Sequence, residues 1–291
     1  MTAAFQRLKY IDIPGVIFLR RTGESKRLTK REDKIKTVSM NEKIGMLYVM
    51  PDNAQELGCR EEQQDYFAYN DIFDMDVVKK FGCAAVLSDG MGGLKNGRDA
   101  AVAGVEAFLQ SYRDYADESD DIDSAMREAL LDANEAVKRC TGAGATMVAV
   151  IVKGSCLNWI SVGDSRIYLF RNNCLRQLNR EHTYAEELDS MYRRGEISRE
   201  EALNNPERRA LTSYLGLPEI VNIDQKSDFH LLPHDIIMLC SDGLYNTLSD
   251  DEISYILSSE SETIAEDLTR ASLMKNNIQQ DNITVVLLKI I

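Results

Sequence analysis

The sequence predicts an α+β fold, a four-layer α-β-β-α sandwich in which two antiparallel sheets are flanked by helix pairs. The first observation is the order of the elements, because strand-like runs come in blocks that are separated by pairs of helical segments. This order differs from the strict strand–helix alternation of a doubly wound parallel sheet. The second is Asn172-Asn173 between two apolar runs, which is typical of a tight hairpin turn and therefore of antiparallel pairing.

Helices are predicted where apolar residues recur at helical spacing. Ala101, Val105, Phe108 and Tyr112 share one face of a helix that starts near residue 97, and a second helix is expected at about 122–139. A second pair is expected at about 250–258 and 261–275. Strands are expected at 44–50, 65–69, 83–87, 145–152, 156–162, 166–170, 174–178, 235–240 and 283–289.

The chain divides by composition into a basic N-terminal segment and one folded domain. Residues 1–43 hold eleven Lys or Arg and five Asp or Glu, a net charge of +6, although the whole chain carries −13. We expect 1–43 to be a flexible basic extension. The alternative is that translation in the cell starts at Met40 or Met46. Residues 44–291 show no internal linker and form a single domain in this interpretation.

Charge and cysteine usage exclude several classes of protein. The net charge of −13 argues against nonspecific binding to nucleic acid or to an anionic membrane. No apolar run approaches the roughly 20 residues of a membrane-spanning helix. The six cysteines lie far apart without CxxC spacing, which favours reduced thiols and a cytoplasmic location.

Aspartates recur at the ends of the expected strands. Asp89 follows the apolar run 83–87, and three glycines occur among the next four residues. Alone, this pattern also fits a strand-to-helix turn with a solvated carboxylate. The pattern recurs at four other strand ends, with Asp65, Asp164, Asp242 and Asp281. Carboxylates and bare backbone carbonyls are the oxygen ligands that hard cations such as Mg²⁺ and Mn²⁺ prefer, so a metal site is predicted.

These motifs resemble, in order and spacing, those of the metal-dependent type 2C serine/threonine protein phosphatases. The matching segments are Arg60-Glu61-Glu62-Gln63-Gln64-Asp65, Asp89-Gly90-Met91-Gly92-Gly93, Gly163-Asp164-Ser165-Arg166, Ser241-Asp242-Gly243-Leu244 and Asp281-Asn282. The resemblance covers about residues 45–291. It implies the α-β-β-α sandwich and hydrolysis of phosphoserine and phosphothreonine in phosphoproteins, with Mn²⁺ or Mg²⁺ as cofactor.

The resemblance also assigns roles to single residues. It implies that Asp89 bridges two ions and that the Gly90 carbonyl contacts one of them. It places the other ion on Asp242 and Asp281, with Asp65 supporting the pair. Asp164 would hold a third ion together with Asp242, and Arg60 would grip the substrate phosphate. A two-metal centre suits phosphoester hydrolysis because it activates a water molecule and neutralises charge around phosphorus.

Simpler interpretations of two of these residues stay open. Arg60 could be an exposed strand-edge arginine paired with Glu61 or Glu62. Asp164 could form only a turn and a salt bridge, since Arg166 follows two residues later.

The sequence also departs from the family pattern. Met91 stands where some family members have a histidine that is proposed as a general acid, Gln63 replaces an Asn, and Glu181 replaces an Asp. The three histidines lie outside the motifs, and a surface position is the favoured interpretation for His182.

Residues 183–222 are similar to the flap of the compact bacterial members. Residues 193–198 separate two short helical segments, and Ser198 with Glu201 has capping-box spacing. We expect a polar, partly helical insertion beside the site. The expected partners are phosphorylated proteins, in opposition to a Ser/Thr kinase, and the expected state is a monomer.

Two other functions remain as alternatives at this point. One is a catalytically weak, phosphatase-like module that binds phosphoproteins. The other is a hydrolase of small phosphoesters or nucleotides, which would use the same ions but add contacts to a base or sugar.

Overall fold

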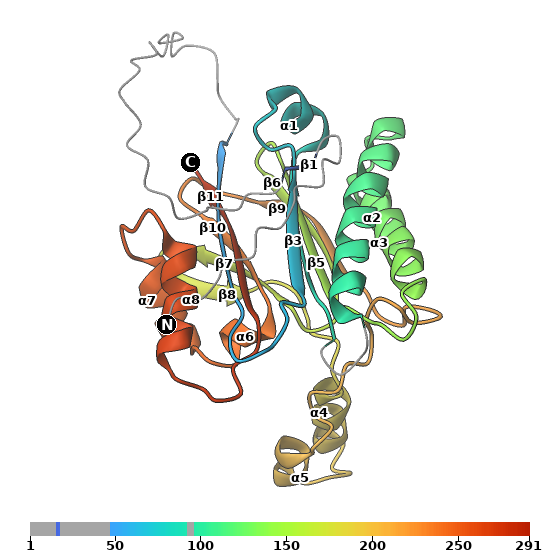
Figure 1. The fold of residues 1–291 in the computed structure, drawn as a ribbon, viewed down its shortest axis with the longest axis vertical. Helices are drawn as coiled ribbons and strands as arrows, with labels where there is room; N and C mark the ends of the chain where they lie inside the picture. Colours follow the sequence, from blue (N-terminus) through green and yellow to red (C-terminus); the bar gives the residue numbers. More distant parts are fainter. Residues whose placement is uncertain (1–15, 18–46, 92–95) are drawn as a thin grey trace.

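The computed structural model describes residues 16–17, 47–91 and 96–291. Two antiparallel sheets lie face to face between two helix pairs, α2 with α3 and α7 with α8 (Figure 1). The first sheet has the order β1 (Val16–Ile17), β3 (Asp65–Asn70), β4 (Cys83–Asp89), β5 (Met147–Lys153), β6 (Cys156–Val162) and β9 (Asp224–His230). The second has the order β2 (Val49–Glu56), β11 (Ile283–Ile290), β10 (Ile236–Cys240), β7 (Arg166–Arg171) and β8 (Cys174–Gln177). The predicted α-β-β-α sandwich is confirmed.

The helices form three groups around the two sheets. The first pair and α1 lie on the first sheet, and the second pair lies on the second sheet, next to the short α6 (Figure 1). The bounds are α1 Met75–Phe81, α2 Gly97–Glu118, α3 Ile122–Lys138, α6 Asp242–Tyr245, α7 Asp250–Leu257 and α8 Ile264–Met274. The remaining two, α4 (Ala185–Arg193) and α5 (Arg199–Asn204), form a lobe that projects from one end of the sandwich (Figure 1).

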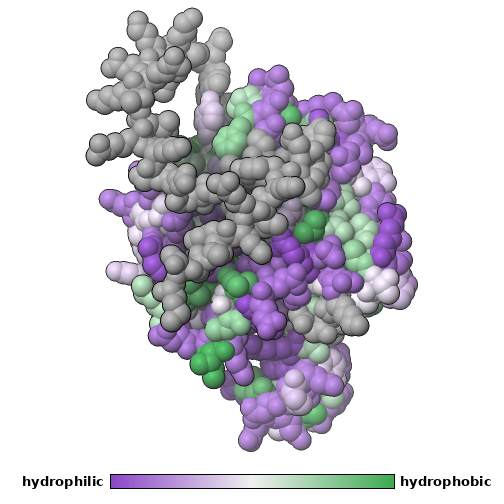
Figure 2. All heavy atoms as spheres, viewed as in Figure 1, coloured by the Kyte–Doolittle hydropathy of each residue, from purple (hydrophilic) through white to green (hydrophobic). Residues whose placement is uncertain are grey.

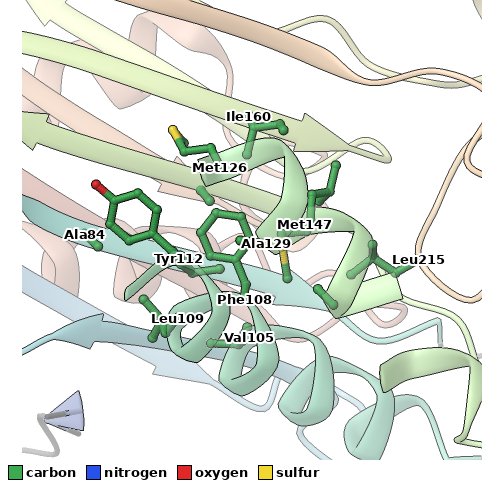
Figure 3. Close-up of a cluster of buried hydrophobic side chains, with 14 of the residues drawn as sticks. Ala84, Val105, Phe108, Leu109, Tyr112, Met126, Ala129, Met147, Ile160 and Leu215 are labelled. Atoms are coloured by element: carbon green, nitrogen blue, oxygen red, sulfur yellow. The ribbon is translucent and has the colours of Figure 1, made fainter. Parts of the chain in front are cut away.

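Three apolar layers separate the four structural layers. Phe108, Met126 and Met147 pack in the layer between the first helix pair and its sheet (Figure 3). In β10, Ile237 and Leu239 face the layer between the sheets, whereas Met238 faces α7 and α8. Side chains alternate across a strand, so a strand that is covered on both faces needs a continuous apolar run. This requirement explains the uninterrupted hydrophobic stretches that predicted the central strands.

The expected helices and the hairpin are confirmed. Both predicted helix pairs form within a few residues of the expected bounds. Asn172 and Asn173 have φ values of 53° and 59°, as a tight turn between β7 and β8 requires. Arg171 pairs directly with Cys174 across that turn.

Several elements differ from the expectation. The strand predicted at 44–50 is β2, at Val49–Glu56, and residues 44–46 lie outside the described part. Its polar residues and Pro51 suggested a loop, but β2 is an edge strand, where a proline is tolerated. The polar edge strand β9 and helix α1, which is capped by Asp74, were missed because neither has a marked apolar pattern.

The basic extension 1–43 lies outside the described residues except for Val16 and Ile17. These two residues form β1 and pair with Asn70 and Tyr69 of β3. Within the described ranges, no helix has the length and apolar character needed to cross a membrane. On the face shown in Figure 2, the surface of the projecting lobe is largely hydrophilic.

Candidate metal centre and phosphate site

Four aspartates meet at one end of the sandwich because of where the strands begin and end. Asp89 is the last residue of β4, and Asp65, the first residue of β3, lies directly opposite it in the sheet. Asp242 is the first residue of α6, immediately after β10, and Asp281 precedes β11, the neighbour of β10. Both sheets therefore contribute two carboxylates to one site.

Asp65 is fixed by hydroxyl groups from the opposite sheet. Its Oδ2 accepts hydrogen bonds from Ser241 Oγ at 2.7 Å and Thr284 Oγ1 at 2.6 Å. The pKa of Asp65 is raised from 3.8 to about 6, mainly by burial; the hydrogen bonds from the two hydroxyls lower it, and the charges of Asp242 and Asp281 raise it. Neither hydroxyl was predicted from the sequence, although Ser241 directly precedes Asp242.

Asp89 has the least favourable electrostatic surroundings for a carboxylate. Desolvation raises its pKa well above 3.8, and the charges of Asp65, Asp242, Asp164 and Asp281 raise it further. Its backbone is held by Thr146, which accepts from Asp89 N–H through Oγ1 at 3.0 Å and donates to the Asp89 carbonyl at 2.9 Å. Thr146 therefore fixes the backbone of Asp89, whereas burial and the neighbouring carboxylates favour the protonated form of its side chain.

Two glycines allow the turns that carry the aspartates to pack closely. A Cβ at Gly90 would lie 2.2 Å from the Gly97 carbonyl oxygen, and one at Gly243 would lie 2.0 Å from the Asn282 carbonyl oxygen. Both contacts are too short for any side chain. The second contact joins the turn of Asp242 to that of Asp281.

Asp242 has one oxygen without a partner. Its Oδ2 accepts from Asn246 Nδ2 at 3.0 Å, whereas Oδ1 is buried and has no hydrogen-bond partner within the described part of the chain. Burial, followed by the charge of Asp281, raises the pKa of Asp242 to about 6. A buried polar atom without a protein partner is rare in folded proteins, and a bound ion or water molecule would supply the missing partner.

Arg60 contacts the cluster through Asp281. Its Nη2 lies 2.7 Å from Asp281 Oδ2, and the other oxygen of Asp281 accepts from the Asn282 backbone N–H at 2.8 Å. The alternative pairing with Glu61 or Glu62 is not what the structure shows. The arginine that the resemblance assigns to phosphate binding is thus beside the aspartate cluster.

Asp164 also belongs to the cluster. Its pKa is raised to about 7 by burial, then by the charges of Asp242 and Glu181. The alternative salt bridge to Arg166 is wrong, because Arg166 Nε binds Glu181 Oε1 at 2.6 Å. Arg166 also stacks over the ring of Tyr245 at 3.5 Å, and the Tyr245 hydroxyl donates to the Asp164 carbonyl at 3.1 Å.

The surface position expected for His182 is wrong. The residue is 6% exposed, and its Nδ1 accepts a hydrogen bond from the Gly163 backbone N–H at 3.1 Å. Burial lowers the pKa of its imidazole. His182 therefore fastens the start of the segment 183–222 to the loop that carries Asp164, a contact that no spacing in the sequence could reveal.

The donor set fits Mg²⁺ or Mn²⁺ in its chemistry. Among the described residues no three His, Cys, Asp or Glu side chains converge closely enough to form a ready metal site. This arrangement is compatible with Mg²⁺, which usually keeps several waters and binds through one or two carboxylates. The orphaned oxygen of Asp242 and the mutual repulsion of the carboxylates are what a cation would relieve.

The fold and this site define a class of hydrolase, and comparison with known proteins identifies the family. The profile of the protein phosphatase 2C family matches residues 60–279. The chain is 33% identical over 219 residues to the serine/threonine phosphatase stp of Listeria welshimeri, covering 70% of this chain and 83% of the relative. The chain belongs to the protein phosphatase 2C family and is a hydrolase of the phosphoprotein phosphatase class.

Solved structures agree with this assignment. The PPM Ser-Thr phosphatase MsPP of Mycobacterium smegmatis, in complex with cacodylate, superimposes with a TM-score of 0.65 at 26% identity, over 82% of this chain and 97% of that one. The catalytic domain of the phosphatase PstP, in complex with two manganese ions, shares the fold with a TM-score of 0.64 at 24% identity, over 84% and 100% of the two chains.

Proposed function

We propose that this protein hydrolyses phosphoserine and phosphothreonine in protein substrates at a two-metal centre of Mn²⁺ or Mg²⁺. The buried, unpartnered Oδ1 of Asp242 within a cluster of carboxylates carries the proposal. The manganese ions bound to the related PstP domain support the choice of metal.

The site residues have distinct roles in this proposal. Asp89 would hold both ions and the Gly90 carbonyl would contact one of them, Asp242 and Asp281 would hold the other, and Asp65 would support the pair. When bound, the two ions supply a nucleophile at neutral pH by lowering the pKa of water, and they neutralise charge on the phosphate.

The other side chains position these groups and the substrate. Ser241 and Thr284 keep Asp65 in a single orientation through their hydrogen bonds. Arg60 binds the substrate phosphate, because a guanidinium offers paired donors that match phosphate oxygens. Asp164 and Asp242 together form a position for a third ion.

Activity on phosphopeptides tests the proposal. We expect Mn²⁺-dependent release of phosphate from a phosphothreonine peptide, and little release from a panel of nucleotides. Asp89→Asn and Asp242→Asn should each reduce turnover by at least about 10³-fold, since two-metal catalysis depends on each ligand. Asp251→Asn, an exposed aspartate of α7, is the matched control and should keep full activity.

The same assay separates the alternatives. A phosphoprotein-binding module would retain the phosphopeptide without turnover, and a small-phosphoester hydrolase would prefer nucleotides. Substantial activity in either Asn variant would contradict the proposed metal centre.

The remaining expectations extend the proposal. Residues 44–291 form the phosphatase domain, with 183–222 as its flap, and the substrates are products of a Ser/Thr kinase. We further propose a cytoplasmic monomer, in keeping with six free cysteines. Light scattering after gel filtration measures the oligomeric state.

A further inference from the structure

The segment that returns from the flap lobe is fixed beside the aspartate cluster. Tyr184 N–H donates to the Ala210 carbonyl at 2.9 Å, and Thr212 N–H donates to the His182 carbonyl at 2.8 Å. Because His182 also accepts from Gly163, the neighbour of Asp164, this ladder ties residues 210–212 to the site. The lobe of α4 and α5 projects from the end of the sandwich at which α6 begins with Asp242 (Figure 1).

Two consecutive arginines in this segment have opposite surroundings. Arg208 makes a two-pronged contact with Asp189, with Nη1–Oδ1 at 2.8 Å and Nη2–Oδ2 at 3.1 Å, and also donates to the Ala202 carbonyl. Arg209 is exposed, and its side chain has no ion pair or hydrogen bond to any residue in the described ranges. Arg208 therefore holds the lobe together, whereas the guanidinium of Arg209 is available to a ligand.

Arg209 lies close enough to the cluster for its charge to act there. It directly precedes the hydrogen-bonded residues 210–212, which are tied to the site, and its charge lowers the pKa of the Asp242 carboxyl, as that of Arg60 does. Arg60 comes from the loop between β2 and β3, so two arginines from separate segments approach the same carboxylates. The net charge of −13 means that carboxylates outnumber cationic side chains in this chain. An arginine that stays unpaired beside the aspartate cluster therefore indicates binding of an anionic group from another molecule.

We propose that Arg209 binds an acidic side chain of the protein substrate, an Asp or Glu within a few residues of the phosphorylated residue. The inference rests on the proposed function and names a substrate class for the same site. Arg60, paired to Asp281 within the cluster, serves the reacting phosphate. Neighbouring residues of an extended peptide are about 3.3–3.6 Å apart, so an acidic side chain a few residues from the phosphorylated residue is within reach of a group beside the cluster.

The test compares three substrates at saturating Mn²⁺. They are a phosphothreonine peptide with Glu on both sides, the same peptide with Gln in those places, and an aryl phosphate. The variants are Arg209→Gln, Arg209→Lys, which keeps the charge, and the control Arg193→Gln, which removes an exposed arginine of the same lobe.

The expected result is a selective change in KM. Arg209→Gln should raise KM for the Glu peptide about tenfold, the typical effect of losing one charge-assisted hydrogen bond. Its kcat, and both constants for the Gln peptide and the aryl phosphate, should change less than about twofold. Arg209→Lys should recover part of the loss, and Arg193→Gln should resemble wild type on all three substrates.

Two outcomes would overturn the inference while leaving the proposed function intact. An equal loss on all three substrates would mean that Arg209 acts on the reacting phosphate or the metal centre. No loss on the Glu peptide would mean that Arg209 does not contact substrate. Absence of phosphopeptide turnover by wild type would instead overturn the proposed function itself, and the inference with it.

Discussion

Arg60 and Asp281 form an ion pair, with 2.7 Å between Nη2 and Oδ2. The proposed function gives each partner another ligand, phosphate for the arginine and a divalent ion for the carboxylate. The carboxylate of Asp281 is thus shared between Arg60 and the ion, and a cation beside a metal ligand opposes metal binding through its charge.

Removing the charge of Arg60 should therefore separate two effects. We expect Arg60→Gln to raise KM for phosphopeptide about tenfold with little change in kcat, because a contact common to ground and transition states is lost. The same change should tighten Mn²⁺ binding to the substrate-free protein, measured by calorimetric titration. Weaker Mn²⁺ binding together with an unchanged KM would place Arg60 in the structural support of the site instead.

Metal should stabilise the fold more at neutral than at acidic pH. The pKa values of Asp65 and Asp242 rise from 3.8 to about 6, and that of Asp164 to about 7, mainly through burial. A carboxyl group whose pKa is higher in the folded than in the unfolded state stabilises the fold fully below its ordinary pKa of 3.8. This contribution is lost as the pH rises through the folded-state values of about 6 to about 7. The metal-free protein should accordingly lose stability over this range.

Divalent ions bind the deprotonated carboxylates, so they should restore stability where protons no longer do. At Mn²⁺ concentrations of 100 times Kd the gain is about 2.7 kcal/mol, or about 5–10 °C in Tm. Thermal unfolding at pH 5 and pH 7.5, with Mn²⁺ or with chelator, measures it. A shift that is equal at both pH values would contradict the titration of these carboxylates.

Much of this fold was accessible from the sequence because burial leaves a pattern. The continuous apolar runs of β4, β5, β10 and β11 reflect coverage on both faces, and the stripe from Ala101 to Tyr112 is the buried face of α2. The edge strands β2 and β9 were misplaced or missed, because none of their residues is fully buried and their polar composition resembles that of loops.

Only the site residues that belong to the sequence motifs could be predicted from the sequence. The positions of Asp65, Asp89, Asp242 and Asp281 at strand ends placed them together, and their mutual effects on pKa agree with this. The Ser241 and Thr284 contacts, the burial of His182 and the Arg60–Asp281 pair join segments far apart in sequence. Such contacts depend on how the two sheets face each other, which no local spacing records.

Gly243 should be essential for the geometry that joins Asp242 to Asp281. A Cβ there would lie 2.0 Å from the Asn282 carbonyl oxygen, and the obstacle is backbone that cannot rotate away. We expect Gly243→Ala to lower the free energy of unfolding by about 2–4 kcal/mol, in the range of severe packing defects, and to weaken Mn²⁺ binding.

Gly142→Ala is the matched control for Gly243→Ala. Gly142 has a φ of +71° but open space around the position of a Cβ, so its cost is backbone strain of about 1–2 kcal/mol. Denaturant unfolding and Mn²⁺ titration measure both variants. Equal Mn²⁺ affinities in the two would show that the Gly243 contact does not position the carboxylates.

The last prediction concerns the lobe of α4 and α5. Tyr184 N–H and the Ala210 carbonyl oxygen are 2.9 Å apart, so residues 185–209 can be replaced by a short Gly-Ser linker without moving the ends. If the lobe shapes the groove for a protein substrate, the replacement should reduce kcat/KM for phosphoprotein far more than for an aryl phosphate. The aryl phosphate needs only the metal centre and Arg60. Asp164→Ala is the complementary variant, because it would remove a third ion at the base of the flap and leave the lobe in place. Equal losses on both substrates in the lobe variant would show that the segment supports the metal centre rather than selecting substrates.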